Sequence, residues 1–111
     1  MINAMILAYE SCKDRFDEPI TFDDFLVLTQ DWEADPVYVG GECAGAILYK
    51  DKEIHCCIIE KYHKKWFSKK IWKDVFVTRL NKYGELFTGV KADNVIGEAF
   101  VERCGFTVYD R

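Results

Sequence analysis

Apolar side chains recur at helical spacing in the first third of the chain. Between residues 3 and 16 they lie mostly three or four positions apart, which places them on one face of a helix. A second helix is predicted over about 22–33. Thr21 is a good N-cap residue for it, and Asp23 and Asp24 follow in the first turn, where the helix dipole favours acids. The apolar positions of the first helix are Ala4, Leu7, Ala8, Cys12 and Phe16.

The pattern changes at Pro36, which cannot continue a helix. Three apolar runs follow, separated by the turn sequences Gly-Gly-Glu and Lys-Asp-Lys, and these runs predict strands. The centre of the third run does not alternate apolar with polar residues, which is typical of a strand that is covered on both faces. The predicted strands are 37–39, 43–49 and 53–60.

Helical spacing returns between about residues 64 and 83. Trp72, Phe76 and Leu80 lie four positions apart and form the apolar face of an amphipathic helix that packs on the sheet. Gly84 is suited to end this helix, because glycine readily adopts the left-handed conformation found there. The rest of the chain predicts a strand at 85–92, a helix at 94–104 and a strand at 106–110.

Two helices, three strands and then alternating helices and strands predict one domain over residues 1–111. We expect an α/β or α+β fold with a mixed central sheet of about five strands flanked by helices. Its reduced, helical N-terminal part comprises residues 1–35, and residues 37–111 form the sheet core.

Charge is distributed unevenly along the chain. Residues 1–50 carry ten acidic and three basic side chains, whereas residues 51–111 carry nine acidic and twelve basic ones, for a net charge of −4. Between residues 61 and 73 the chain has six lysines and no acidic residue. Such a cluster favours either a solvated face or a site for a phosphate-bearing ligand. Aromatic residues between lysines also occur in nucleic-acid binders, but Trp72 belongs to the apolar helix face and the net charge is negative, so we do not expect nucleic acid as a partner. The six are Lys61, Lys64, Lys65, Lys69, Lys70 and Lys73.

The distribution of apolar residues and cysteines bears on location. No apolar run approaches the roughly 20 residues that a membrane-spanning helix needs. The N-terminal segment has neither the basic leader nor the cleavage site of an export signal. The five cysteines are odd in number and irregularly spaced, which favours reduced thiols over a disulfide framework. We therefore expect a cytoplasmic protein without a membrane anchor.

The most specific motif is NVIGEAFVERCGF, residues 94–106, which combines an N-cap residue, a mostly apolar helix and a Gly-Phe pair that ends it. It resembles the segment Asn-x-x-Ala-x-x-x-Tyr-x-x-x-Gly-Phe with which members of the GNAT superfamily of N-acyltransferases commonly end. Asn94, Gly105 and Phe106 match, whereas Gly97 replaces the Ala and Val101 replaces the Tyr. The resemblance extends from about residue 37 to the end of this motif and slightly beyond, and includes the predicted central strands.

This resemblance implies transfer of an acyl group, most simply acetyl from acetyl-CoA, to an amine of a protein or small molecule. The third strand would polarise the thioester through its backbone amides, and Glu53 would deprotonate the amine directly or through water. The phosphates would bind where the following helix begins, and the pantetheine arm would lie against the last helix. The residues implied for the cofactor are Ile58, Ile59, Glu60, His63, Lys64, Lys65, Trp66, Phe67, Ser68, Asn94, Gly97 and Phe100.

Two departures from the family pattern leave a second interpretation open. Val101 cannot protonate the leaving thiolate as the family's Tyr does, so Tyr109, Cys104 or water would have to supply that proton. Residues 63–68 correspond to the family's phosphate loop, Arg/Gln-x-x-Gly-x-Gly/Ala, but contain neither glycine. The alternative is a GNAT-fold protein with a degenerate site that serves as a binding or interaction module. Abbreviated GNAT-like proteins occur in bacteriophages, which implies a phage protein that acts in the host cytoplasm on a host partner.

The histidine and cysteines of the third predicted strand favour no other chemistry. His55 shares the face of Glu53 and is expected to be a hydrogen-bonded inner histidine rather than a base. Cys56 and Cys57 are adjacent on a strand and face opposite ways, so they do not form the short knuckle that structural zinc prefers. Nothing in the sequence predicts an oxyanion hole for a cysteine nucleophile. We therefore expect no metal.

Overall fold

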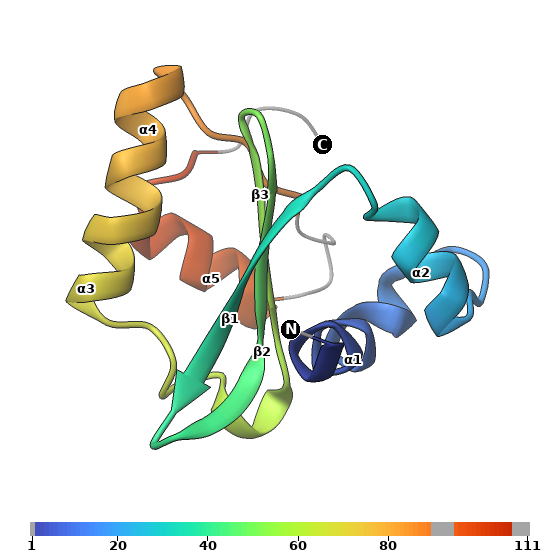
Figure 1. The fold of residues 1–111 in the computed structure, drawn as a ribbon. Helices are drawn as coiled ribbons and strands as arrows, with labels where there is room; N and C mark the ends of the chain where they lie inside the picture. Colours follow the sequence, from blue (N-terminus) through green and yellow to red (C-terminus); the bar gives the residue numbers. More distant parts are fainter. Residues whose placement is uncertain (1, 90–94, 108–111) are drawn as a thin grey trace.

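The fold is a small sheet between two layers of helices, as seen in a computed structural model that describes residues 2–89 and 95–107. The elements are α1 (Ile2–Cys12), η1 (Lys13–Arg15), α2 (Phe22–Leu28), β1 (Glu33–Val39), β2 (Glu42–Lys50), β3 (Glu53–Ile58), η2 (Glu60–Tyr62), α3 (Lys69–Ile71), η3 (Trp72–Val77), α4 (Thr78–Tyr83) and α5 (Val95–Arg103). The strands form an antiparallel sheet in the order β1-β2-β3, with α1 and α2 on one face and α3, α4 and α5 on the other (Figure 1). The mixed α and β character agrees with the prediction.

The first two helices begin where the sequence predicts but end earlier. The first continues only as the short turn η1 after Cys12, and the second ends at Leu28 instead of residue 33. Residues further along this stretch instead begin β1, which starts at Glu33 and includes Pro36. Proline is tolerated in this strand because β1 forms an edge of the sheet that the described residues build.

Thr21 starts α2 through the predicted cap. Its hydroxyl oxygen accepts a hydrogen bond from the backbone N–H of Asp24 at 3.1 Å, and the Asp24 carboxylate accepts one from the backbone N–H of Thr21 at 3.0 Å. This reciprocal capping box satisfies two backbone donors that the helix itself leaves without partners. The cap therefore orients α2, which places Phe25 in the core.

We expect Thr21→Ala to lower the free energy of unfolding by about 1 kcal/mol, because the helix then loses its N-cap acceptor. Urea unfolding followed by circular dichroism measures the change. Thr78→Ala is the matched control, since Thr78 is exposed within a continuous helix and its hydroxyl contacts only the Lys73 carbonyl. Equal midpoints for the two variants would contradict the assigned cap.

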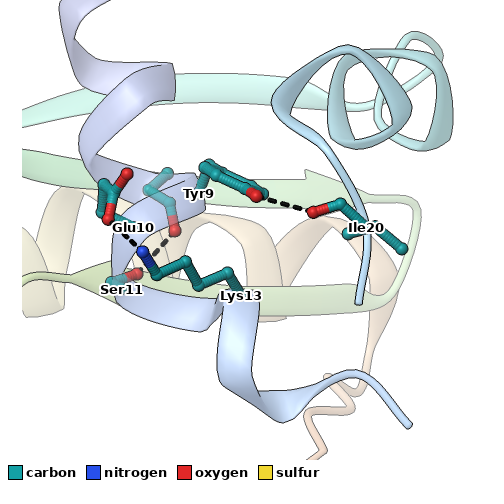
Figure 2. A network of polar contacts seen from close by, with 6 residues as sticks. Tyr9, Glu10, Ser11, Lys13 and Ile20 are labelled. Carbon is teal, nitrogen blue, oxygen red and sulfur yellow. Dashed lines mark hydrogen bonds and ion pairs between the residues drawn. The ribbon is translucent and has the colours of Figure 1, made fainter. Parts of the chain in front are cut away.

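Tyr9 connects α1 to the segment that leads into α2 (Figure 2). Its hydroxyl donates a hydrogen bond to the carbonyl oxygen of Ile20 at 2.6 Å, and its ring lies 5.7 Å from the rings of Phe22 and Phe25. The ion pair of Glu10 with Lys13 beside it is exposed and contributes little, because water screens it. The two helices thus form one layer through aromatic contacts and a hydrogen bond from the Tyr9 side chain to the main chain.

A bulge bends β2 near the turn that joins it to β1. Val37 pairs with Gly45 and Tyr38 pairs with Cys43, so Ala44 is the extra residue. Its carbonyl accepts a hydrogen bond from the backbone N–H of Ile59 at 3.0 Å. The bulge thereby fixes the end of β3, from which the chain turns toward the second helical layer.

The sheet buries apolar side chains on both faces, as predicted for its third strand. Toward α1, Leu48 and Cys57 pack with Ala8 in one cluster. Toward the other helices, Ile54 and Ile58 belong to a second cluster, which the loop after β3 and the helix beyond it complete. The residues contributed to that cluster from outside the sheet are Tyr62, Trp66 and Phe76.

The predicted helix over residues 64–83 forms from Lys69 onward. It runs through α3, a π-helical stretch at η3 and α4, and ends at Gly84, which has a φ angle of 82°. The prediction of a start at residue 64 was wrong, because the chain forms a loop there and Ser68 caps the helix. Phe76 is buried, but Leu80 of the predicted apolar face remains 40% exposed.

The described residues form a three-stranded sheet, so the predicted five-stranded sheet is not shown. Of the predicted strand 85–92, Phe87 forms an isolated parallel bridge with Glu53. Residues 90–94 and 108–111 lie outside the described residues, and with them most of the predicted last strand and Asn94. The predicted last helix is present as α5, beginning at Val95 among the described residues.

Candidate functional site

The centre of the candidate site is a parallel connection from β3 to Phe87. The backbone N–H of Ile54 donates to the carbonyl of Phe87 at 2.9 Å, and the backbone N–H of Phe87 donates to the carbonyl of Lys52 at 2.8 Å. Between these two segments the chain passes through η2, α3, η3 and α4, so helices connect β3 to the single residue that pairs with it in parallel. Phe87 therefore lies beside the start of β3 and not beside its end.

The far end of β3 has no such partner among the described residues. There the ring of His63 folds back, and its Nε2–H donates to the Ile58 carbonyl at 2.7 Å, since a carbonyl oxygen can only accept. The N–H of Ile59 is taken by Ala44 on β2. A thioester carbonyl is polarised by a backbone N–H, and of the three residues proposed for this task Ile59 uses its N–H within the protein.

Glu53 and His55 form a hydrogen-bonded pair at the start of β3. They lie two residues apart on one face of the strand, and the His55 Nε2 is 2.7 Å from the Glu53 Oε2. Since a carboxylate only accepts, Nε2 carries the hydrogen and Nδ1 of the neutral ring keeps its lone pair. His55 is hydrogen-bonded as predicted, but its side chain is 30% exposed and therefore reaches solvent. A histidine that is oriented by a carboxylate can act as a general base, and His55 with Glu53 has this composition.

This pair lines an open cleft at the edge of the sheet. The walls come from the start of β3, the end of the long helix, the segment around Phe87 and the residues after α5. Gly89 lies against His55, since a Cβ on it would sit 3.9 Å from the imidazole Cε1. The cleft therefore joins residues from both ends of the parallel connection from β3 to Phe87. Lining side chains other than the pair include Trp32, Trp72, Phe87, Glu102 and Phe106.

The loop proposed for phosphates carries exposed charge around a buried ring. Lys64 and Lys65 are exposed, whereas Trp66 is only 6% exposed and belongs to the core. Ser68 accepts a hydrogen bond from the backbone N–H of Ile71 at 3.2 Å, which uses its hydroxyl as the helix cap. The six lysines singled out in the sequence are all exposed, and among them Lys61 forms an ion pair with Glu42 at 3.6 Å.

Aromatic rings fill the space where the pantetheine arm is proposed. Phe100 of α5 lies 5.4 Å from the ring of Trp66 and 5.3 Å from that of Phe67. Phe67 also contacts Phe76 at 5.8 Å while remaining 40% exposed. The structure brings these three proposed cofactor residues together, but as a packed cluster, so an arm lying along α5 requires one ring to turn away.

The residues around the missing Tyr are apolar or weakly acidic. Val101, Cys104 and Phe106 line the cleft, and burial raises the pKa of the Cys104 thiol, which therefore stays protonated at neutral pH. Gly97 lies within α5, and Asn94 and Tyr109 lie outside the described residues. Cys104 is therefore a protonated group that lines the cleft close to Val101 in the sequence.

The cysteines of β3 do not add a nucleophile. Burial, together with the neighbouring Cys104, raises the pKa of Cys56 to about 12, so this thiol is neutral at physiological pH. Cys57 lies in the opposite cluster toward α1, as the alternation along a strand predicts. In the described part of the chain, no three His, Cys, Asp or Glu side chains are arranged to hold a metal ion.

Two aromatic residues of the site escaped the sequence analysis. Trp32 follows α2 without a motif around it, and its ring lies 5.5 Å from that of His55. Phe87 lies in a predicted strand, but only the tertiary fold places its backbone beside Glu53. The contact of Trp32 with His55 on β3 depends on how the residues before β1 pack against the sheet, which the sequence around Trp32 does not encode.

No helix in the described residues is long and apolar enough to cross a membrane. Comparisons with protein-family models, curated proteins and solved structures found no match to this chain.

Proposed function

We propose that this chain is a GNAT-like N-acyltransferase that moves an acyl group, most simply acetyl from acetyl-CoA, to an amine. The observation that carries the proposal is the Glu53–His55 pair in an open cleft beside the parallel connection from β3 to Phe87. In the proposed fold, the segment around Phe87 and the chain after α5 complete a five-stranded sheet. This fold is consistent with the parallel connection from β3 through helices to Phe87 and with α5, which follows it.

The proposed reaction needs a base, a polarised carbonyl and an acid. The Glu53–His55 pair accepts a proton from the ammonium form of the acceptor, and the free amine attacks the thioester carbon. A C–N bond forms, the C–S bond breaks, and the leaving thiolate takes a proton from Cys104, Tyr109 or water. The products are an amide and the thiol of CoA. Much of the rate enhancement would come from holding amine and thioester together.

Lys64 and Lys65 are the proposed contacts for the CoA phosphates. Both are exposed near the start of the long helix, where backbone N–H groups and the helix dipole favour anions. Acetyl-CoA would arrive from the side of α5, and the amine from the side of Glu53. We place this activity in the cytoplasm, or in the host cytoplasm for a phage-encoded protein.

A second candidate function is an interaction module that keeps the fold without the reaction. The observation that favours it is the contact between Trp66 and Phe100, which closes the proposed path of the pantetheine arm. Phe67, partly exposed beside the lysines, would then belong to a surface for a protein partner. This candidate needs no base, so it leaves the Glu53–His55 pair without a role.

Acetyl-CoA binding separates the two candidates. At 100 times its dissociation constant a ligand stabilises the native state by about 2.7 kcal/mol, and we expect an upward shift of the melting temperature in acetyl-CoA. The double variant Lys64→Glu, Lys65→Glu should lose most of this shift, because it replaces two phosphate contacts by repulsive charges. Differential scanning fluorimetry at several acetyl-CoA concentrations measures both effects.

The matched control is Lys13→Glu, Lys82→Glu, which changes the net charge equally at exposed or half-buried positions outside the proposed loop. This control should keep the shift of the original protein. Absence of any shift at millimolar acetyl-CoA would rule out the transferase and favour the interaction module. An undiminished shift in the Lys64, Lys65 variant would mean that the phosphates bind elsewhere.

A further inference from the structure

Trp32 is an aromatic side chain in the cleft to which the proposed reaction assigns no role. It follows α2, where its backbone N–H donates to the carbonyl of Thr29 at 3.0 Å. Its ring is half-buried and lies 5.5 Å from His55, with an angle of 44° between the ring planes. The tilted contact leaves the two rings beside the cleft instead of stacking them face to face.

An indole, an imidazole and a carboxylate therefore meet at one corner of the cleft. The Glu53 carboxylate is held by His55 at 2.7 Å, and both side chains remain partly exposed. Among the other charged groups lining the cleft, Lys52 and Glu85 neutralise each other at 2.9 Å. Lys50 pairs with Glu53 across the hairpin, and Asp51 and Glu102 also line the cleft. With Glu53 included, the lining holds four acids and two lysines, so the cleft carries a net negative charge.

We propose that Trp32 and Glu53 form a subsite for a primary alkylammonium group, with the cation held in the cleft beside the indole and the carboxylate, both of which contact His55. This rests on the proposed function and deepens it, because it assigns the acceptor class: an amine bound as its cation, on a flexible hydrocarbon stem. An aromatic face attracts a cation, and a carboxylate accepts its N–H groups, so the two together select ammonium over neutral or anionic groups. The stem would run along the apolar walls of the cleft.

Lysine side chains and polyamines both carry a primary alkylammonium group on a hydrocarbon stem. Two probes therefore test which of them the subsite binds. We would titrate the full chain, without acetyl-CoA, with Nα-acetyl-lysine N-methylamide and with spermidine in a calorimeter. At least one should bind, and the Nε-acetylated form of the lysine probe, which lacks the charge, should bind at least tenfold more weakly. Trp32→Leu should weaken binding by roughly fivefold or more, whereas Trp32→Phe should retain most of it.

Trp72→Phe is the matched control, because Trp72 lines the same cleft but stacks on Phe76, on the other side of the sheet. It should leave the affinity within about twofold, and melting temperatures verify that every variant is folded. Equal affinity of the charged and acetylated probes would overturn the proposal. So would unchanged affinity in a folded Trp32→Leu protein, since Trp32 would then only pack against His55.

The outcome is independent of acetyl-CoA binding. If the ammonium probes bind as expected while acetyl-CoA produces no thermal shift, the subsite stands as a cation site and the acyl transfer fails. If acetyl-CoA binds but neither probe does, the transferase proposal survives and the alkylammonium subsite is wrong.

Discussion

Gly45→Ala should destabilise the protein by about 3 kcal/mol or more, a large part of the 5–15 kcal/mol that typically separates folded and unfolded states. A Cβ on Gly45 would sit 2.1 Å from the carbonyl oxygen of Cys57, which is backbone and cannot turn away. Gly45 also has a φ angle of 141°, which residues with a side chain rarely adopt. The substitution therefore strains β2 and separates it from β3. Urea unfolding, followed by tryptophan fluorescence and circular dichroism, measures the loss.

Gly89→Ala is the matched control for this experiment. A Cβ at Gly89 meets only the His55 ring, at the ordinary contact distance of 3.9 Å, and we expect a change below about 0.5 kcal/mol. If the unfolding midpoint of Gly45→Ala matched that of Gly89→Ala, the close approach of β2 and β3 at the bulge would be wrong. In that case the register of β3 against β2, which places Glu53 and His55 at the cleft, would also be wrong.

Glu53→Gln should lower the rate of acyl transfer by roughly 10²–10⁴-fold, the range typical of a lost general base. The amide keeps the shape of the side chain but loses the negative charge that orients and stabilises His55 as it takes a proton. Initial rates with saturating acetyl-CoA and an alkylamine acceptor, detected as released thiol, measure the effect. Melting temperature in acetyl-CoA should shift as in the original protein, because Glu53 does not contact the phosphates in the proposed complex.

The control for the charge of the cleft is Glu85→Gln. Glu85 lines the same cleft and pairs with Lys52, but it is not hydrogen-bonded to His55, so we expect the transfer rate to stay within about threefold. His55→Gln should lose activity together with Glu53→Gln, and the double variant should lose little more, as expected for two residues that act as a unit. A Glu53→Gln protein with more than a third of the original rate would remove Glu53 from the catalytic role.

Local sequence signals predicted the capped start of α2 and the end of α4, because each depends on a few neighbouring residues. Thr21 with Asp24 closes a capping box, and Gly84 adopts the left-handed conformation that ends the helix. The burial of both faces of β3 was equally predictable from its unbroken apolar run. These features require no knowledge of what lies across the sheet.

Local signals failed where distant segments compete for the same residues. Residues 29–32, predicted as the end of the second helix, instead form a turn that leads into β1, where Glu33 and the residues after it pair with β2. The start predicted at residue 64 moved to Lys69, because Trp66 is drawn into the core and leaves a loop behind it. Long-range pairing and burial outweigh helix propensity in both places.

The sequence by itself determined that both faces of β3 are covered, that Thr21 begins α2 and that Gly84 ends α4, because these features depend on spacing and residue type within one element. Only the tertiary structure decided that Phe87 joins β3 in parallel and that Trp32 meets His55. It also decided that Trp66 contacts Phe100 where a cofactor arm was expected. These contacts join segments far apart in the chain, and their geometry depends on how the hairpin and the helices pack.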